Sequence, residues 1–499
     1  MSENGAIKGD ICLSEWVKRH GLALLTDWYE LTMMGGYHRS GIGDQQACFE
    51  YFFRDLPPHN GFAVLAGLEA FLSYCENLRF EEEDIAFLRS SGNFDESFLD
   101  SLKSFKLTCN IWAMPEGMVV FPFEPIIRVQ GRLFEVQLLE TFLLNAMNYP
   151  TLVATKAARI CSVAGNDPVV EFGLRRAQGP DGGLVGSRAA YIGGCSATSN
   201  VLAAKYFGIP VAGTVAHSWV MSFPSELESF RAYVKIYPDS PILLVDTYDT
   251  LESGVPNAII IFKELQKQGN PQRPAIRLDS GDLAKLSKVA YEMITAAGLN
   301  DPLIVASNEL DEDLIAELKR QGAKINSWGV GTNLITSKDA PALSGVYKLV
   351  AIHNGKTWEP RLKISSNPVK MTDPGVKRAV RFYDDDDTPI GDILYLVDEE
   401  IPKGEQVIGL DRQRFHRTYR LRPVHRNQEL ARLCFKDGRR IVPPESIQDI
   451  RNRAKKQIAA LPDELKRLRF PEIYPVALSP RLAKMKENLL RNNQGNDKN

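Results

Sequence analysis

From about residue 168 to residue 350, the chain repeats a short apolar run that ends in polar residues, with helical patterns between several of the runs. Runs that are apolar on both faces and alternate with helices are typical of a parallel sheet covered by helices. We therefore expect an α/β fold with a closed β/α barrel over residues 151–355, and an open doubly wound sheet is the alternative. The eight runs begin at Val169, Tyr191, Val211, Ile242, Ala275, Leu303, Ile325 and Val346.

The regions on either side of these runs have different patterns. Residues 1–150 combine amphipathic helical spacing over residues 62–78 and 135–149 with short β-rich segments interrupted by prolines, which predicts an α+β N-terminal domain. Residues 356–499 lose the alternation and predict a C-terminal α/β extension that packs on the other two domains. In that extension, Asp384–Asp387 predicts a solvated turn.

Composition narrows the class of protein. The 499 residues are 44% hydrophobic and 24% charged, as in a soluble globular protein. The net charge of −2 predicts neither a nucleic-acid partner nor an anionic membrane surface. Seven cysteines without C-x-x-C spacing favour reduced thiols, and the N-terminal segment does not resemble a secretory signal. We therefore expect a cytoplasmic protein.

Polar residues follow most of the predicted strands. In a barrel or a doubly wound sheet, the carboxyl ends of the strands meet at one edge, so these side chains should converge. Guanidinium groups and glycine turns suit phosphate oxygens, whereas carboxylates suit ribose hydroxyls and Mg²⁺. The set predicts a sugar-phosphate ligand and includes Arg175, Arg176, Thr214, His217, Asp246, Arg277, Asp279, Asp282, Ser307, Gly329, Gly331, Thr332 and Lys348.

Each of these residues also has a purely structural interpretation. Asp279 and Asp282 precede a helical pattern and could be helix N-caps. The turn Gly329–Asn333 could simply connect a strand to a helix, and His217 beside an apolar run could be a core histidine. The functional interpretation depends on the recurrence of polar residues at the same end of several strands.

Six motifs, in order along the chain, resemble those of the nicotinate phosphoribosyltransferase family. That family converts nicotinate and 5-phosphoribosyl 1-diphosphate into nicotinate mononucleotide and diphosphate in NAD salvage. The resemblance implies an irregular β/α barrel, coupled ATP hydrolysis, dependence on Mg²⁺, and a homodimer whose active site lies at the subunit interface. The motifs are TDWYELTM (26–33), GLRRAQGPDGG (173–183), GTVAHSW (213–219), IRLDSGDL (276–283), GVGTN (329–333) and SGVYKLV (344–350).

The resemblance assigns roles around the pyridine ring and the nucleotide. His217 is implied as the residue that ATP phosphorylates. Thr214 and Arg277 are implied to hold the pyridine carboxylate, and Tyr29 to cover the ring from the neighbouring subunit. For a phosphohistidine, a neutral imidazole nitrogen must be able to reach the γ-phosphoryl group.

The resemblance also assigns roles around phosphate and metal. Gly329, Gly331 and Thr332 are implied to bind the phosphate of the phosphoribosyl group. One or both of Arg175 and Arg176 are implied as further phosphate ligands.

Asp279 is the implied partner of the ribose hydroxyls or of a metal, and Asp246 is a second candidate for Mg²⁺. Two other functions stay open at this point. A nicotinamide or quinolinate phosphoribosyltransferase could use the same fold, and a protein without catalytic activity could bind metabolites on it.

Overall fold

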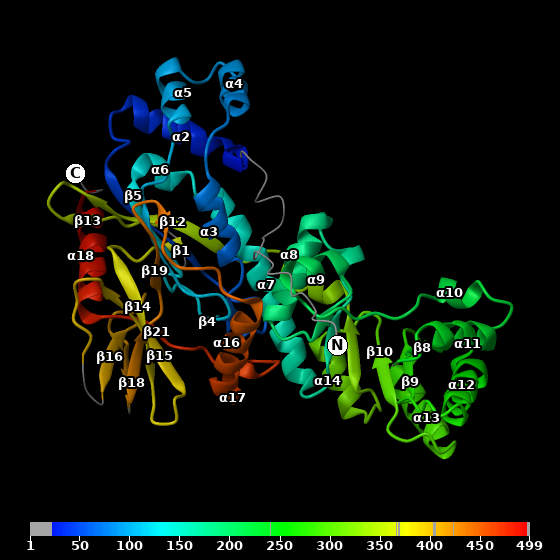
Figure 1. Ribbon diagram of the computed structural model, residues 1–499. Coiled ribbons are helices and arrows are strands. Elements are labelled where there is room, and N and C mark those ends of the chain that lie inside the picture. Colours follow the sequence, from blue (N-terminus) through cyan, green and yellow to red (C-terminus); the bar gives the residue numbers. More distant parts are fainter. Residues whose placement is uncertain are drawn as a thin grey trace. The chain divides into compact units, whose positions relative to one another are not determined.

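The chain folds into two compact units, described here from a computed structural model (Figure 1). Unit 1 combines residues 1–155 with residues 342–499, and unit 2 is Lys156–Pro341. The first and last regions, which sequence patterning separates at residues 150 and 355, therefore belong to one unit. The structure describes residues 22–239, 241–365, 367, 370–402, 406–422 and 424–496.

Unit 2 is built on a parallel six-stranded sheet with the order β7-β6-β11-β10-β9-β8. Every pairing in it is parallel, and a parallel bridge between Thr198 and Val211 continues it beyond β7. The expected α/β class is confirmed, whereas closure of these strands into a barrel stays a prediction. The strands are β6 (Val169–Glu171), β7 (Ala197–Thr198), β8 (Leu243–Leu244), β9 (Ala275–Leu278), β10 (Leu303–Ala306) and β11 (Ser327–Val330).

Helices connect these strands where the sequence predicts them. In the helix after β9, the Asp282 carboxylate caps the N-terminus by accepting from the Lys285 N–H at 3.0 Å. The helix after β10 ends just before Gly322, whose φ of 76° is the left-handed conformation that favours glycine. The helices of unit 2 include α8 (Gly179–Ile192), α9 (Val201–Phe207), α11 (Glu226–Ile236), α12 (Val255–Lys267), α13 (Leu283–Ala296) and α14 (Glu312–Arg320).

The eighth apolar run is not part of this sheet, so its prediction as a barrel strand is wrong. It forms β12 (Gly345–His353) in unit 1. There it pairs antiparallel with β1 (Gln46–Phe53), from Ala47 opposite Ile352 to Phe53 opposite Gly345. The partner strand is about 300 positions away in the sequence, and local patterning carries no signal for such a pairing.

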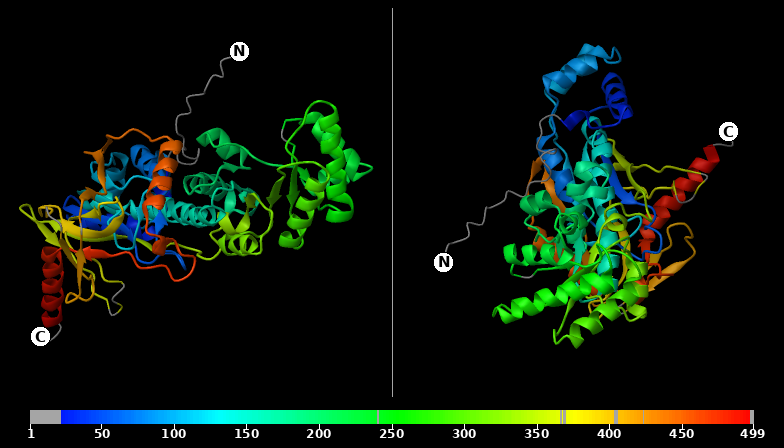
Figure 2. Two further views of the ribbon diagram at one scale, coloured as in Figure 1. Left: turned by 90° about the horizontal axis from the view of Figure 1, so that it is seen from below. Right: turned by 90° about the vertical axis from the view of Figure 1, so that its right-hand side faces the viewer.

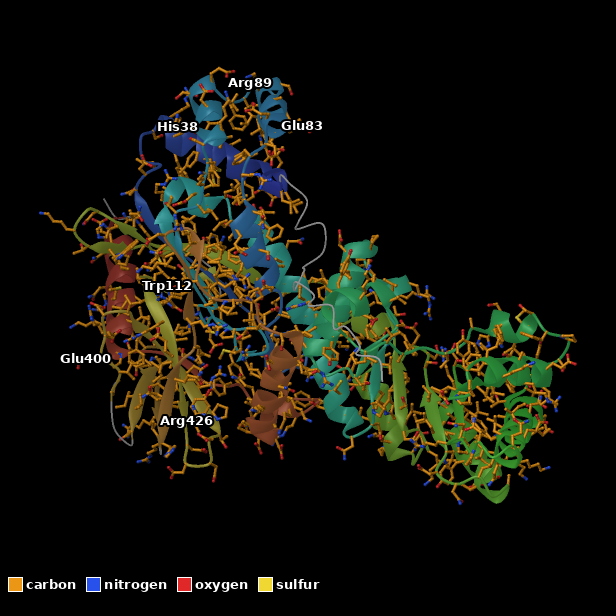
Figure 3. All side chains as sticks on the ribbon, in the orientation of Figure 1. His38, Glu83, Arg89, Trp112, Glu400 and Arg426 are labelled. Carbon is orange, nitrogen blue, oxygen red and sulfur yellow. The ribbon has the colours of Figure 1, made fainter. Side chains whose placement is uncertain are left out.

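The first sheet of unit 1 joins the two ends of the chain. Its order is β13-β12-β1-β5-β3-β19-β20, so strands from residues 46–132 lie beside strands from residues 345–440. Arg128 of β5 lies 4.2 Å above the ring of Trp112 of β3, which is labelled in Figure 3. The other strands are β3 (Asn110–Ala113), β5 (Ile127–Arg132), β13 (Trp358–Pro360), β19 (Arg432–Lys436) and β20 (Arg439–Arg440).

The second large sheet of unit 1 has the order β17-β16-β21-β15-β14-β18. Helix α18 (Pro480–Asn496), drawn in red, packs along β15 and β16 (Figures 1 and 2). The predicted turn at Asp384–Asp387 connects β14 with β15. The strands are β14 (Lys377–Tyr383), β15 (Pro389–Leu396), β16 (Val407–Leu410), β17 (Thr418–Leu421), β18 (Arg426–Glu429) and β21 (Val476–Leu478).

Two helices predicted in the N-terminal region have different bounds in the structure. Helix α3 (Leu68–Asn77) begins later than expected because Gly67 has a φ of 107° and lies so close to the Ala146 carbonyl that no side chain would fit. The second predicted helix is divided into α6 (Leu133–Gln137) and α7 (Glu140–Ala164), and α7 continues past Pro150. The predicted domain boundary at residue 150 therefore falls inside a helix.

Candidate active site

A cavity of about 430 Å³ lies at the carboxyl ends of the parallel strands in unit 2. Ser199 directly follows β7, Arg277 lies on β9 and Asp279 directly follows β9, at the edge where the alternation of strands and helices predicts a site. The cavity is open enough for a small ligand and mixes apolar walls with charged groups. Its lining consists of Phe172, Arg175, Ser199, Gly213, Thr214, Val215, Ala216, His217, Leu244, Arg277 and Asp279.

Arg277 is held in this cavity by three hydrogen bonds. It projects from β9, and its nitrogens donate to Ser307 Oγ, Thr214 Oγ1 and Asp279 Oδ1, each at 2.8 Å. The side chain is 13% exposed. A guanidinium fixed in this way at a cavity wall is suited to a planar anionic group such as a carboxylate.

Asp279 is an ionised carboxylate in spite of partial burial. Burial raises its pKa, but the Ser307 hydroxyl that donates to it and the charge of Arg277 more than compensate, with a smaller contribution from His217, so its pKa lies below the usual value. The structure therefore makes Asp282 the helix cap and Asp279 a cavity residue, which resolves the two interpretations of this pair.

His217 lines the cavity, but it does not lie on a strand. It is the first residue of the short helix α10 (His217–Met221), after an extended segment that follows the Val211 bridge. The prediction of a position at a strand end is corrected to the start of this helix. Its Nδ1 lies 3.2 Å from Thr247 Oγ1, and its Nε2 lies 3.8 Å from Asp279 Oδ2. The imidazole thus has one nitrogen held by a hydroxyl and the other near a carboxylate.

Two residues of the site were not predicted from the sequence. Phe172 lines the cavity, and Thr247 contacts His217. Phe172 follows β6, and its ring lies 5.6 Å from the Arg277 guanidinium carbon. A Cβ atom at Gly329 would lie 2.5 Å from the Phe172 ring, so the glycine leaves space for this aromatic wall. A search for polar residues at strand ends does not select an aromatic residue. The position of Phe172 directly after β6 is the feature that could have indicated it.

The structure distinguishes the two adjacent arginines. Both are exposed, but Arg175 lines the cavity and Arg176 is not among the lining residues. Both lie on the turn of residues 174–176 that follows Gly173, whose N–H donates to the buried Glu171 carboxylate. Glu171 also accepts from Thr198 Oγ1 at 2.6 Å, so a buried carboxylate fixes the start of this turn.

Gly331 and Thr332 follow β11 but are not among the residues that line the cavity. Thr332 begins the short helix α15 (Thr332–Ile335), and its hydroxyl donates to Glu309 Oε1 at 3.1 Å. In this glycine turn, a Cβ atom at Gly331 would be in ordinary contact with the Phe172 carbonyl at 3.4 Å, so only the Gly329 position requires a glycine beside Phe172.

Asp246 is the residue best placed to assist Asp279 with a metal. Its Oδ2 accepts from the Asp279 N–H at 2.8 Å and from the Ser280 hydroxyl at 2.7 Å, while its buried Oδ1 has no hydrogen-bond partner in the described structure. Within the described residues, no three acidic, histidine or cysteine side chains are grouped as metal ligands. Two neighbouring carboxylates fit Mg²⁺, which takes its other ligands from water and substrate phosphates.

Tyr29 belongs to unit 1 and is described there. It lies in the first turn of α2 (Trp28–Arg39) and is 46% exposed. Burial on its inner side, together with the negative charges of Glu140 and Glu30, raises the pKa of its phenol. Tyr29 is therefore uncharged at neutral pH and presents an exposed aromatic ring.

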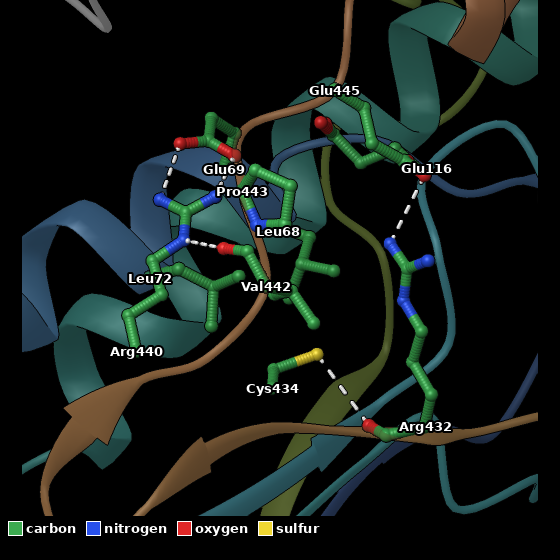
Figure 4. A pocket seen from close by; sticks show the side chains of 10 residues that line it. All are labelled: Leu68, Glu69, Leu72, Glu116, Arg432, Cys434, Arg440, Val442, Pro443 and Glu445. Carbon is green, nitrogen blue, oxygen red and sulfur yellow. Dashed lines mark hydrogen bonds and ion pairs between the residues drawn. The ribbon is translucent and has the colours of Figure 1, made fainter.

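Two pockets of unit 1 are poorer candidates than the unit 2 cavity. One, shown in Figure 4, has a volume of about 20 Å³, enough for about one water molecule. At its wall, Arg440 donates to both carboxylate oxygens of Glu69 at 2.7 Å and thereby joins β20 to α3. A larger one of about 370 Å³ includes His38 and Arg132, but Arg132 already pairs with Asp44 and Glu135.

Among the residues that the structure describes, no helix has the length and the apolar character needed to span a bilayer.

Family models match the chain in three consecutive parts. Residues 24–148 match the nicotinate phosphoribosyltransferase N-terminal domain, residues 168–381 match the nicotinate phosphoribosyltransferase family, and residues 376–486 match the nicotinate phosphoribosyltransferase C-terminal domain.

Individual proteins match over almost the whole chain. Nicotinate phosphoribosyltransferase of Bacillus subtilis is 44% identical over 473 residues, which are 93% of this chain and 94% of the relative. The crystal structure of human nicotinic acid phosphoribosyltransferase has a TM-score of 0.82 and 34% identity, and the match covers 93% of this chain and 99% of the human chain. Nicotinate-nucleotide pyrophosphorylase from Pyrococcus furiosus, at 21% identity and a TM-score of 0.69 over 91% of this chain and 98% of its own, shares the fold.

Proposed function

The chain belongs to the nicotinate phosphoribosyltransferase family, and on this premise we propose that it transfers the phosphoribosyl group of 5-phosphoribosyl 1-diphosphate to nicotinate. The products are nicotinate mononucleotide and diphosphate, and the reaction is a salvage step towards NAD. The observation that carries this proposal is the guanidinium of Arg277, fixed by three hydrogen bonds at the wall of the unit 2 cavity.

Nicotinate fits the chemistry of this wall. Its carboxylate would accept charge-assisted hydrogen bonds from Arg277, with the Thr214 hydroxyl beside it. Phe172 offers an aromatic face for the pyridine ring. Arg175, on the same cavity, is our candidate for a phosphate of the second substrate, in preference to Arg176. For Gly329, Gly331 and Thr332 we retain the phosphate-binding role implied by the family motif.

The reaction needs positioning more than acid–base catalysis. The pyridine nitrogen has a free lone pair and attacks C1 of the ribose, while the bond from C1 to the diphosphate oxygen breaks. Positive charge develops on the ribose ring as that bond lengthens. The ionised Asp279 carboxylate is suited to bind the ribose hydroxyls and to stabilise this charge.

Mg²⁺ is proposed to accompany the diphosphate, where it would neutralise charge on the leaving group. Asp246 and Asp279 are the candidates to hold it, since the partnerless Oδ1 of Asp246 can accept a cation. Asp246 itself anchors the main chain at Asp279 and so keeps the second carboxylate at the cavity.

His217 is proposed to couple ATP to this reaction. An imidazole nitrogen would attack the γ-phosphorus of ATP, so that a nitrogen–phosphorus bond forms and ADP leaves. The added negative charge next to Asp279 would change affinity at the diphosphate site. Incubation with γ-labelled ATP should give an acid-labile phosphate on His217. His217→Ala should lose the label and the stimulation by ATP but keep the basal transfer. Loss of the basal transfer as well would contradict a role in coupling alone.

A homodimer with a shared active site is part of the proposal, with Tyr29 of one subunit covering the pyridine bound by its partner. The exposed ring of Tyr29 in unit 1 is consistent with such a contact. We also retain the expectation of a cytoplasmic protein.

A comparison of three pyridine substrates tests the function. Purified protein is given 5-phosphoribosyl 1-diphosphate and Mg²⁺ with nicotinate, nicotinamide or quinolinate, with and without ATP, and mononucleotide formation is measured. We expect transfer to nicotinate. Preference for the amide or for the dicarboxylate would replace the proposal with a related transferase, and no transfer to any base would favour a binding protein.

A further inference from the structure

Glu30 is a buried carboxyl group next to the exposed ring of Tyr29, and neither the sequence motifs nor the proposed reaction gives it a role. It lies on α2, and the residue is fully buried. Its Oε2 accepts a hydrogen bond from Gln137 Nε2 at 2.7 Å, and a weaker interaction with the Tyr29 phenol also lowers its pKa. Its buried Oε1 has no hydrogen-bond partner in the described structure. A carboxyl group in such a place is poorly equipped to carry a charge.

Lys348 is the cation whose charge acts on Glu30, but it already forms an ion pair with another acid. Lys348 of β12 donates to Glu140 Oε1 of α7 at 3.1 Å, which leaves Glu30 without an ion-pair partner of its own. Ionisation of Glu30 would place a second carboxylate charge beside a single ammonium group. The charge of an ionised Glu30 in turn raises the pKa of the phenols of Tyr29, Tyr37 and Tyr74.

The other ionic groups of α2, and Asp27 just before it, have partners of their own. At the far end, Arg39 pairs with Asp95, and His38 contacts the Ser97 hydroxyl. Asp27, which precedes α2, accepts from the Thr141 hydroxyl at 3.0 Å. Within the described residues, the charge state of Glu30 is therefore set by burial, by the hydrogen bonds with Gln137 and Tyr29, and by the charges of Glu140 and Lys348.

We propose that Glu30 is a positioning residue whose ionisation adds a negative charge behind Tyr29 and weakens the binding of nicotinate. The inference rests on the proposed function, in which Tyr29 covers the pyridine. Tyr29 itself does not supply this charge because its phenol stays protonated at neutral pH. A neutral Glu30 leaves the aromatic surface uncharged, whereas an ionised Glu30 repels an anionic substrate.

The charge on Glu30 is expected to change within the neutral pH range. Burial raises the pKa of Glu30 to about 7; the Gln137 hydrogen bond opposes this shift, and the charge of Glu140 adds to it. Below pH 7 the group is mainly protonated, and above pH 7 it is mainly ionised. The affinity for nicotinate should therefore fall as the pH rises through this range.

The first test measures kcat and KM for nicotinate between about pH 5.5 and pH 8.5. In the wild-type protein, KM should rise with pH by roughly threefold to tenfold, the effect of one charge within about 10 Å in a partly solvated site. Glu30→Gln keeps the size and polarity of the side chain but cannot ionise. It should remove this inflection and leave kcat unchanged. An unaltered inflection in Glu30→Gln would overturn the inference.

Two further variants keep the test decisive. Glu140→Gln removes the repelling charge and releases Lys348, so the inflection should move to lower pH. An unmoved inflection overturns the proposal even where Glu30→Gln does not fold. His38→Gln changes the histidine of the same helix and serves as the matched control, because it should leave the inflection in place.

A direct titration separates this inference from the proposed function. NMR of the full-length protein, labelled with ¹³C at glutamate side chains and assigned through Glu30→Gln, should give a Glu30 midpoint near 7. A midpoint near the ordinary value overturns the inference, whatever the activity. Absence of nicotinate transfer by the wild-type protein would instead refute the proposed function.

Discussion

Asp279 of unit 2 and Glu30 of unit 1 are both carboxyl groups beside a proposed contact with the pyridine substrate, yet their environments have opposite effects. Burial disfavours the charge of both. Arg277 and the Ser307 hydroxyl compensate at Asp279, and its pKa is lowered. Within the described residues, the Gln137 and Tyr29 side chains and the Lys348 charge, which Glu140 shares, do not offset the burial of Glu30, and its pKa is raised. Local partners, more than residue type or burial alone, decide which acid is ionised at neutral pH.

The difference also gives opposite dependences of stability on pH. Asp279 stabilises the folded protein above the ordinary pKa of an aspartate, and this contribution is lost as the pH falls through the lowered value. Glu30 behaves in the reverse sense, because its proton is held more tightly in the folded state. Folding therefore disfavours the ionised form of Glu30 in unit 1 and favours the ionised form of Asp279 in unit 2.

The largest expected effect follows from removing the cation of the Asp279 site. Arg277→Gln leaves Asp279 without its ion-pair partner and nicotinate without a guanidinium, so kcat/KM for nicotinate should fall by about a thousandfold or more. Arg277→Lys restores the charge but not the three fixed donors, so its activity should be intermediate. A loss below tenfold in Arg277→Gln would contradict the assigned role.

Removal of the charge of Asp279 should have the next largest effect. Asp279→Asn retains an acceptor but loses the charge, so kcat/KM should fall by about a hundredfold in steady-state assays. Asp282→Asn is the matched control in the same loop, because asparagine caps a helix about as well as aspartate. Equal losses in both variants would mean that the loop structure matters rather than the Asp279 charge.

The free energy of unfolding of Glu30→Gln, compared with that of the wild type, tests the raised pKa of Glu30. The unfolded chain loses the Glu30 proton near its ordinary pKa of 4.5, whereas the folded protein holds it to about 7. The wild-type protein therefore loses stability as the pH rises between these values. The variant should be more stable than the wild type by about 2 kcal/mol at about pH 8 and nearly equal at about pH 5, as measured by urea unfolding. An equal difference at both pH values would contradict this account.

The smallest effect is expected from the neutral partner of Asp279. Ser307→Ala removes one hydrogen bond to the carboxylate and one acceptor for Arg277, while the ion pair remains. The pKa of Asp279 should rise, and KM for nicotinate should increase by about threefold to tenfold. Ser199→Ala, at the same cavity, is the control that should stay near the wild-type value.

The polar residues at the ends of the predicted strands predict much of the candidate site. Arg277, Asp279 and Thr214 are polar residues beside short apolar runs, and parallel strands place them at one edge. Phe172 is missed because an aromatic residue after a strand resembles core. The choice between Arg175 and Arg176 is also missed, since adjacent residues on a turn have the same sequence environment and face different directions.

The sequence by itself predicted the alternation of strands and helices in unit 2, a helix cap at Asp279 or Asp282, and the polar groups at the strand ends, because these depend on local periodicity and chain chemistry. Tertiary structure alone decided that the run at Val346 pairs with β1, that Asp282 rather than Asp279 caps a helix, and that Lys348 forms its ion pair with Glu140 rather than Glu30. Such outcomes depend on groups brought together from distant parts of the chain, and the free energy of a buried charge depends on those neighbours.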